Sequence, residues 1–241
     1  MSGAVSGTLS GTGGDPEERG HGAGSLPERL KSGTRALHAA AERSGAMARL
    51  LAGTLERERY CVLLRSLHAI YAALEAALEL RADDPLVAPV CLQGLARREA
   101  LAADLQVLHG EGWRQALPLP PSAHRYARRL RRLARWHPAL LAAHAYVRYL
   151  GDLHGGQVLR GLVARRFGLA VGSGTAFYAF GDRSATQALV VAFRHGLAEI
   201  GRRDPARVES LVREAQRAFE AHCRLFEEIE ATPLPALPGR T

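Results

Sequence analysis

The chain of 241 residues has little cysteine, and the three cysteines are far apart. An odd number of widely separated cysteines, here Cys61, Cys91 and Cys223, does not resemble a disulfide framework. No Cys-x-x-Cys pair occurs, so a zinc ribbon and a dithiol redox centre both lack their minimum parts. We therefore expect three reduced thiols.

Long apolar runs and a signal sequence are also missing. Arg or His interrupts every apolar stretch before it reaches the roughly 18–20 residues that a bilayer span needs. Residues 1–24 are rich in Gly and Ser, carry Asp15, Glu17 and Glu18, and have no apolar segment typical of a secretory signal. These residues predict a disordered tail of a cytoplasmic protein.

Lysine is nearly absent, because every basic residue except Lys31 is an arginine. The 32 basic residues exceed the 24 acidic ones, which gives a net charge of +8 and a pI near 10.1. A balance of this kind favours an acidic partner, which includes nucleic acid, an acidic redox protein and an anionic small ligand. Apolar residues make up 47% and charged residues 23%, proportions typical of a soluble globular protein.

The hydrophobic pattern has helical periodicity throughout. Ser25-Leu26-Pro27-Glu28 has the form of a capping box with proline in the first turn, which predicts the start of the first helix. Glycine and proline clusters separate the periodic segments. The sequence predicts helices over residues 25–42, 57–80, 92–109, 122–136, 138–167, 184–201 and 205–231. We expect one all-α domain over 25–231, followed by a flexible Pro-rich tail over 232–241.

Three glycines interrupt the strongly helical segment around Asp152. Gly151, Gly155 and Gly156 each cost about 1 kcal/mol relative to alanine inside a helix, so their presence needs a reason. Gly151 and Gly155 are four residues apart and therefore share one helix face. That bare face allows two interpretations: close packing against another helix, or a kinked helix whose backbone approaches a flat ligand, with Asp152 beside it.

His38 and Glu42 are also four residues apart, so their side chains are neighbours on one helix face. A carboxylate beside an imidazole is a common arrangement around a metal-bound histidine, because it orients the ring. Taken alone, His38 is more often a surface or packed residue. Combined with a bare glycine face, one axial histidine suits a planar macrocycle.

Four segments together resemble the haem oxygenase family. The run at 143–159, AHAYVRYLGDLHGGQVL, is similar to the family signature, and TRALHAAAE at 34–42 is similar to its proximal helix. HAIYAALE at 68–75 resembles a second-helix motif, and LFEE at 225–228 resembles the final helix. Because the segments keep the family order and approximate spacing, the resemblance covers essentially residues 25–231.

The resemblance implies a haem sandwiched between a proximal helix and a kinked distal helix. It implies that haem is both cofactor and substrate, and that molecular oxygen and reductase-supplied electrons convert it to biliverdin, carbon monoxide and ferrous iron. His38 becomes the iron ligand, oriented by Glu42, and Asp152 organises the waters that deliver protons. The other positions carried over are Tyr71, Arg148, Gly151 and Gly155 in the distal site, Lys31, Arg35 and Arg194 at the propionates, and Tyr146, Phe219 and Phe226 around the haem.

Several positions depart from the family pattern. His154 stands where a small polar residue is usual, and its side chain either joins the proton network or simply faces outward. Val190 replaces a basic propionate residue, His222 replaces an amide, and Val147 replaces a hydroxyl residue. A competing interpretation is therefore a haem-storage or haem-sensing protein without turnover, although the retained Asp152 argues for an enzyme.

The segment from His124 to Trp136 has six arginines on one face and apolar residues on the other. This face is either an ordinary solvated surface or a docking surface for an acidic ferredoxin or flavoprotein reductase. No recognition motif for nucleic acid accompanies the charge, so we expect no nucleic-acid partner. The final residues from Thr232 are too few to cross a bilayer, which resembles the soluble bacterial members that lack a membrane anchor.

Overall fold

The computed structural model describes residues 24–233, and within that range it contains helices and connecting loops but no strands. The predicted all-α class is thereby confirmed. The expected N-terminal tail and most of the Pro-rich C-terminal tail lie outside the described residues. The long helices are α1 (Leu26–Glu42), α3 (Arg57–Leu80), α4 (Arg98–Leu108), α6 (Pro121–Trp136), α8 (Gly151–Phe167), α9 (Arg183–Arg203) and α10 (Val208–Ala231). The short elements are α2 (Gly45–Leu51), η1 (Ala88–Val90), α5 (Trp113–Ala116), η2 (Pro138–Leu140), α7 (Leu141–Ala145), η3 (Tyr146–Leu150), η4 (Ala176–Tyr178) and η5 (Pro205–Arg207).

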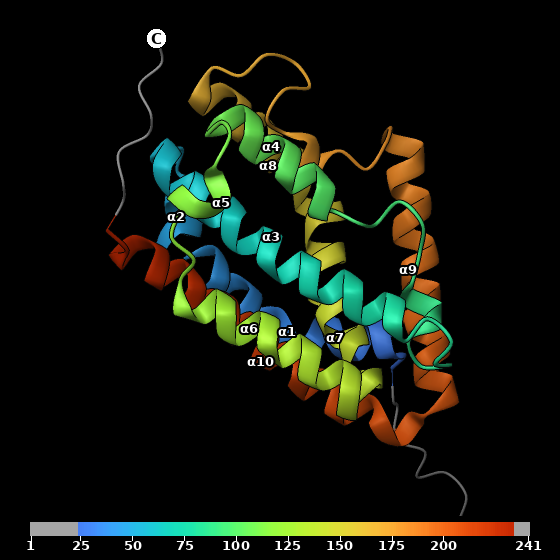
Figure 1. Ribbon diagram of the computed structural model, residues 1–241. Coiled ribbons are helices and arrows are strands. Elements are labelled where there is room, and N and C mark those ends of the chain that lie inside the picture. Colours follow the sequence, from blue (N-terminus) through green and yellow to red (C-terminus); the bar gives the residue numbers. More distant parts are fainter. Residues whose placement is uncertain (1–23, 234–241) are drawn as a thin grey trace, which may run out of the picture.

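Helix α1 begins as the sequence predicts. The backbone N–H of Ser25 donates a hydrogen bond to the Glu28 carboxylate at 2.8 Å, and Pro27 occupies the first turn. The helix then packs along α10 (Figure 1). Gly33 permits this approach, because a Cβ atom at that position would lie 2.6 Å from Cγ1 of Val212 on α10. Helix α1 is therefore held in place by helix α10.

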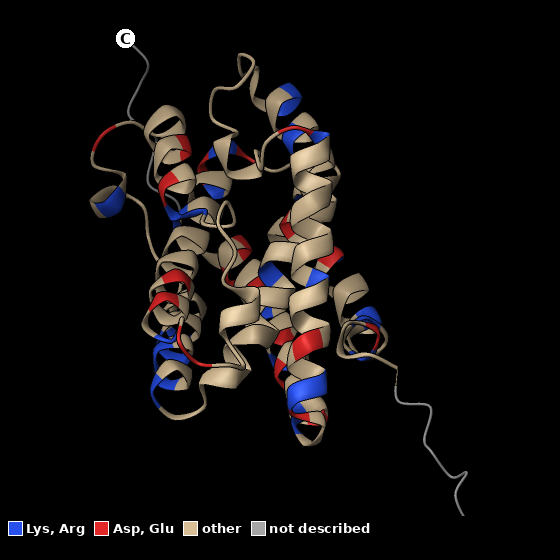
Figure 2. Cartoon of the chain, turned by 90° about the vertical axis from the view of Figure 1, so that its right-hand side faces the viewer, with Lys and Arg blue, Asp and Glu red and all other residues tan. Residues whose placement is uncertain are grey.

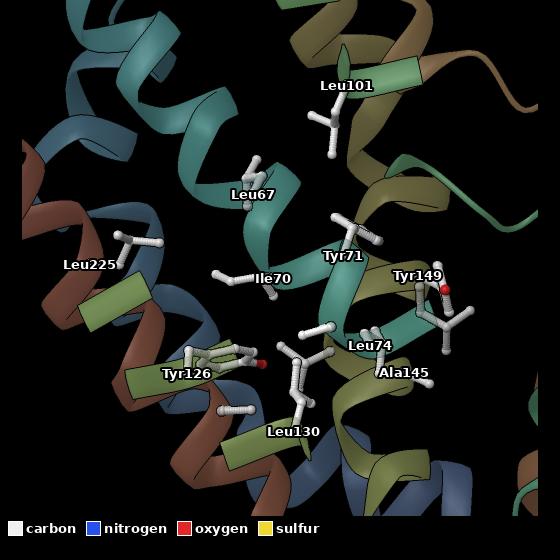
Figure 3. Packing of buried hydrophobic residues seen from close by; sticks show 14 of the residues in the cluster. Leu67, Ile70, Tyr71, Leu74, Leu101, Tyr126, Leu130, Ala145, Tyr149 and Leu225 are labelled. Carbon is white, nitrogen blue, oxygen red and sulfur yellow. The ribbon is translucent and has the colours of Figure 1, made fainter. Parts of the chain in front are cut away.

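Helix α3 forms the centre of the core and packs against α6 (Figure 1). Its side chains Ile70 and Leu74 reach into the space between the two helices, where Tyr126 and Leu130 of α6 meet them (Figure 3). All four side chains are buried. Helix α3 is long and apolar enough to cross a membrane, but 67% of its most apolar stretch of 18 residues is buried inside the fold. It is therefore accounted for as a core helix.

Helix α4 starts six residues later than predicted, at Arg98 instead of residue 92. The cause is a contact with α3: one carboxylate oxygen of Glu75 accepts the backbone N–H groups of Arg97 at 2.6 Å and Arg98 at 3.1 Å. The Arg97 guanidinium also binds the carbonyl oxygen of Gly94 at 2.9 Å, which holds the preceding segment in a loop. A carboxylate more than twenty residues away thus caps this helix.

Two further features differ from the prediction. The break at Ser44 and Gly45 is present, but a short helix, α2, follows it directly. Residues 138–167 form a succession of helical segments in which η3 is a π-helical turn. Gly151 itself keeps ordinary helical angles, φ −59° and ψ −47°. The irregularity is therefore the π turn before the glycines, and the glycines do not break the helix. Such turns often occur at functional sites.

Candidate functional site

His38 lies on the exposed part of α1, and 54% of its side chain is accessible. Its Nδ1 atom is 3.7 Å from Oε1 of Glu42, one helical turn later, as the sequence spacing predicts. Its ring meets Phe219 of α10 edge-on, with ring centroids 5.7 Å apart. This packing and the nearby carboxylate orient the imidazole while leaving Nε2 without a hydrogen-bond partner among residues 24–233. Such a nitrogen is suited to bind a metal ion.

The glycine face of α8 is open. A Cβ atom at Gly151 or at Gly155 would find no other heavy atom within 4 Å, whereas one at Gly156 would contact Tyr178 at 3.6 Å. Close helix packing is therefore the wrong interpretation for Gly151 and Gly155, and it applies only to Gly156. The two open positions expose bare backbone that a flat ligand can approach.

His38 and the glycine face of α8 lie on elements that are in contact. Tyr146 opens the π turn that leads to Gly151, and its hydroxyl is 3.4 Å from Oγ1 of Thr34. Thr34 precedes His38 by one turn of α1 and is buried. The contact between Thr34 and Tyr146 therefore fixes α1 against η3, the segment that leads into α8.

Asp152 is the centre of a buried hydrogen-bond network. The Tyr71 hydroxyl of α3 donates to Oδ2 of Asp152, and Nη2 of Arg148 donates to Oδ1 at 2.9 Å. Arg148 also reaches the Tyr71 hydroxyl through Nε at 3.3 Å and Nε2 of His222 through Nη1 at 3.2 Å. Only 8% of the Asp152 side chain is accessible. The predicted distal residues Tyr71, Arg148 and Asp152 are thus brought together.

The electrostatic setting of this carboxylate is unusual. Burial raises the pKa of Asp152 above its ordinary value, while the adjacent Arg148 guanidinium opposes that shift. Burial, and next the charge of Arg148, lower the pKa of His222 to about 3, so His222 is neutral at physiological pH. A carboxyl group with a raised pKa is suited to proton transfer.

Three basic residues at the expected propionate positions have exposed side chains. Lys31 and Arg35 lie on α1, and Arg194 lies on α9. Within the described part of the chain, none of the three has a carboxylate within ion-pair distance. Along α9, Arg194 is the one arginine or lysine between Arg183 and Arg202, and Figure 2 shows how little charge the middle of this helix carries. Unpaired cations of this kind are available to an anionic ligand.

The predicted aromatic residues and the positions that depart from the family pattern differ in burial and in contacts. Phe219 contacts His38, and Phe226 is buried beside His222 with ring centroids 6.0 Å apart. His154 is exposed, and its Nδ1 is bonded to the Leu150 carbonyl at 2.7 Å. It has no hydrogen bond to Asp152, Arg148 or Tyr71. The two apolar replacements, Val147 and Val190, are buried.

A second buried polar group, which was not among the predicted site residues, lies behind this site. His144, on α7, bonds the Tyr126 hydroxyl at 2.9 Å through Nδ1 and the Glu214 carboxylate at 2.8 Å through Nε2. Arg129 donates to the same carboxylate through Nε at 2.5 Å. The sequence did contain one indication of this group, because Glu214 falls among the apolar positions of α10. In the structure its side chain is fully buried.

The described residues contain no cluster of three or more His, Cys, Asp or Glu side chains that could hold a metal ion. The three cysteines are free thiols, as predicted. A metal bound at His38 therefore needs its other ligands from a bound group. A planar macrocycle fits the single imidazole, the bare glycine backbone and the unpaired cations.

Comparison with known proteins agrees with this geometry. The family model described as Heme oxygenase matches residues 24–228. Heme oxygenase 1 of Nostoc sp. is 34% identical over 212 residues, which cover 88% of this chain and 89% of that protein.

Solved structures show the same fold. Heme oxygenase-2 of Synechocystis sp., solved in complex with heme and NO, has a TM-score of 0.82 at 34% identity, covering 86% of both chains. Heme oxygenase-1 of Synechocystis, solved in complex with heme, has a TM-score of 0.78 at 33% identity, covering 86% of this chain and 93% of that one.

The fold and site define a helical haem-degrading oxidoreductase. The chain belongs to the haem oxygenase family, and its function is that of a haem oxygenase, whose family activity degrades haem to biliverdin.

Proposed function

We propose that this chain binds haem between α1 and the glycine face of α8, and cleaves it to biliverdin, carbon monoxide and ferrous iron. Molecular oxygen is the co-substrate, and a reductase supplies the electrons. The observation that carries this proposal is the open backbone at Gly151 and Gly155 directly beside the buried Asp152 network. Bound haem supplies the iron that activates oxygen and the ring carbon that is oxidised.

On the proximal side, His38 is the iron ligand. Its free Nε2 would hold the iron of bound haem, while Glu42 and Phe219 orient the imidazole ring. A neutral imidazole suits this chemistry, since a thiolate ligand favours O–O cleavage instead. Lys31, Arg35 and Arg194 bind the propionates, and Tyr146, Phe219 and Phe226 line the site.

On the distal side, Asp152 orients water and holds a proton near the open glycine face. Tyr71 and Arg148 fix both of its carboxylate oxygens, so its position does not depend on the ligand. Because Gly151 and Gly155 have no side chains, the backbone of α8 itself would form the wall of the haem site. With haem bound, backbone this close would limit the space above the ring and would favour oxidation at one of its edges.

The stoichiometry of a single turnover tests the reaction. One equivalent of haem should yield one carbon monoxide, trapped by deoxymyoglobin, and one ferrous iron, captured by ferrozine, together with one biliverdin. Haem loss without carbon monoxide would contradict the proposal, because peroxide bleaching also destroys haem.

Haem storage or sensing without turnover is the second candidate, and exposed His154 beside Gly155 motivates it. In that case His154 would bind the iron in addition to His38. His154→Ser separates the two. A catalyst keeps its ferric spectrum and turnover in this variant, whereas a storage protein changes from a six-coordinate low-spin to a high-spin spectrum and gains no turnover.

The electron donor is an acidic protein, a ferredoxin or flavoprotein, which docks on the basic face of α6. A groove of about 710 Å³ on this face is lined mainly by arginines, together with Trp136 and His137. Two of these arginines are neutralised, Arg125 by Glu228 at 2.5 Å and Arg129 by Glu214. Arg128 and Arg132 have no such partner among residues 24–233, so they attract negative charge.

Charge reversal tests this docking surface. Arg128→Glu/Arg132→Glu should raise KM for an acidic ferredoxin at least tenfold and weaken its salt dependence, while turnover with a small chemical reductant stays unchanged. Arg183→Glu/Arg202→Glu, at the two ends of α9, is the matched control. Equal effects in both double variants would show that only the net charge matters.

We also propose that residues 25–231 form the whole catalytic domain and that the enzyme acts in the cytoplasm. A protein restricted to residues 24–233 should bind haem with the affinity of the full chain. Cell fractionation should recover the native protein with cytoplasmic markers, and recovery in the membrane fraction would contradict that location.

A further inference from the structure

His222 lies behind the distal network and has no role in the steps above. It is on α10 and is only 3% exposed. Its ring stands edge-on to Tyr126, with centroids 5.1 Å apart, and beside Phe226 at 6.0 Å. The ring is therefore enclosed by aromatic side chains from α6 and from its own helix.

The hydrogen bonds of His222 determine its tautomer. Nδ1 is 2.8 Å from the carbonyl oxygen of Ala218, which can only accept, so Nδ1 carries the proton. Nε2 is 3.2 Å from Nη1 of Arg148, which can only donate. His222 is consequently a neutral ring whose one free acceptor points at Arg148, in agreement with its lowered pKa.

The neighbouring network leaves no competitor for that acceptor. Hydrogen bonds to His144 and Arg129 outweigh burial and hold the pKa of Glu214 at about 2, so Glu214 is a carboxylate that accepts from Nε2 of His144. Burial lowers the pKa of His144, so its ring is neutral and Nδ1 accepts a hydrogen bond from the Tyr126 hydroxyl. Tyr126 thus contacts His222 through its ring alone, and Nε2 of His222 remains available to Arg148.

Arg148 is held at three corners of its guanidinium group. Nε faces the Tyr71 hydroxyl, Nη1 faces His222, and Nη2 faces Asp152. The group is planar and rigid, so fixing one corner fixes the directions of the others. Without His222, the Nη1 corner loses its only acceptor among residues 24–233, and only the contacts with Tyr71 and Asp152 remain to keep the group from turning.

We infer that His222 is a positioning residue of the oxygenase reaction, which acts by holding Arg148 in the orientation that fixes the Asp152 carboxylate. This inference rests on the proposed role of Asp152. The contacts of Arg148 with His222 and Asp152, however, are present in the haem-free protein and can be tested there.

Two substitutions separate hydrogen bonding from packing. In His222→Gln, the amide oxygen can occupy the place of Nε2 and accept from Arg148. In His222→Leu, a side chain of comparable bulk has no acceptor. Should the leucine variant fail to fold, the unbranched His222→Met provides the apolar replacement. In the haem-free protein, Phe226→Leu is the matched control for the pKa measurement alone, since it alters the packing of the His222 ring without removing the acceptor.

The pKa of Asp152 in the haem-free protein is the first readout, measured by ¹³C NMR titration of labelled aspartate with Asp152→Asn for assignment. His222→Leu should raise this pKa by one unit or more, because the Arg148 charge is no longer held at the carboxylate. His222→Gln and Phe226→Leu should stay within about 0.3 units of the natural protein. An unchanged pKa in the folded leucine or methionine variant would overturn the inference.

Single turnover of the haem-loaded protein is the second readout. The apolar variants should form biliverdin at least tenfold more slowly, and His222→Gln should recover to within about threefold. Equal rates in the apolar and glutamine variants would also overturn the inference. If no variant or natural protein turns over haem, the proposed function fails, while the Asp152 pKa still decides whether His222 positions Arg148.

Discussion

Arg148 donates a hydrogen bond to Asp152 at 2.9 Å across one turn of the helix, in a position where little of either side chain is accessible. A carboxylate at this depth needs its partners, because an unpaired buried charge costs several kcal/mol. Arg148 and Tyr71 supply them from η3 and α3. The orientation of Asp152 is therefore a property of the folded chain before any ligand binds.

Replacing the carboxylate by an amide should separate binding from chemistry. Asp152→Asn keeps the side-chain shape, so we expect haem affinity within about threefold of the natural protein. Biliverdin formation should fall at least tenfold, since a positioned proton-transfer group contributes about 10²–10⁴-fold. Haem titration and single-turnover rates measure the two effects. Asp182→Asn at the start of α9, which retains its capping oxygen, is the control and should behave as the natural protein.

Gly151 and Gly155 of α8 should tolerate a methyl group without loss of stability. Gly151→Ala meets no neighbouring atom and removes the flexibility of glycine, so it should stabilise the haem-free protein by up to about 1 kcal/mol. Gly155→Leu should fold equally well but bind haem at least tenfold more weakly, because its side chain occupies the open face.

Gly196 provides the contrast to these two positions. A Cβ atom there would lie 2.0 Å from the Pro89 carbonyl oxygen, so Gly196→Ala should destabilise the protein by about 1–3 kcal/mol. Urea unfolding of the three haem-free variants gives the comparison. A loss of stability in Gly151→Ala as large as that in Gly196→Ala would mean that the α8 face is packed and not open.

The buried Glu214 should contribute a pH-dependent part of the stability. Its folded pKa of about 2 lies below the unfolded value of 4.5, so its contribution is present above about pH 4.5 and is lost as the pH falls towards 2. Glu214→Gln removes the charge from the bonds to His144 and Arg129, and should cost about 1.5–3 kcal/mol at pH 7. The difference from the natural protein should shrink below pH 4.5.

Unfolding by urea at several pH values from 7 to 3, followed by circular dichroism, measures this dependence. Glu209→Gln is the control, because the Glu209 side chain is 55% exposed and its ion pair with Arg29 is worth little. A difference between Glu214→Gln and the natural protein that stays constant down to pH 3 would contradict the assigned pKa.

His38→Ala should remove the axial nitrogen while leaving the fold intact, since the His38 side chain is half exposed. The variant should retain haem weakly, lose the nitrogen signature in the resonance Raman and electron paramagnetic resonance spectra, and lose turnover. Added imidazole should restore the signature. The exposed His124→Ala serves as control. Unchanged spectra and activity in His38→Ala would assign the ligand elsewhere.

Local signals predicted much of the fold. The limits of α3 agree with the apolar periodicity of residues 57–80, and the capping box at Ser25 gave the start of α1. The predicted start of α4 was wrong because Glu75, which lies on another helix, determines where α4 begins. The π turn at Tyr146–Leu150 was not predicted either, because no local pattern distinguishes it from an ordinary helix.

The site was predictable to a similar degree. Spacing alone paired His38 with Glu42 and placed Gly151 and Gly155 on one face, but it left the nature of that face open. The resemblance supplied Tyr71 and Arg148, and the structure brought them to Asp152. The partners of His222 and the His144–Glu214 pair required the fold, since each joins residues more than 65 positions apart.

The visible spectrum of the haem-loaded protein during one turnover tests the central claim most directly. One equivalent of ferric haem is added to the purified protein, a reductant is supplied in air, and the spectrum is followed over time. We predict that the Soret band decays while a biliverdin band grows. A Soret band that persists in the reduced, oxygen-exposed protein would contradict it and would identify a haem-binding protein without oxygenase activity.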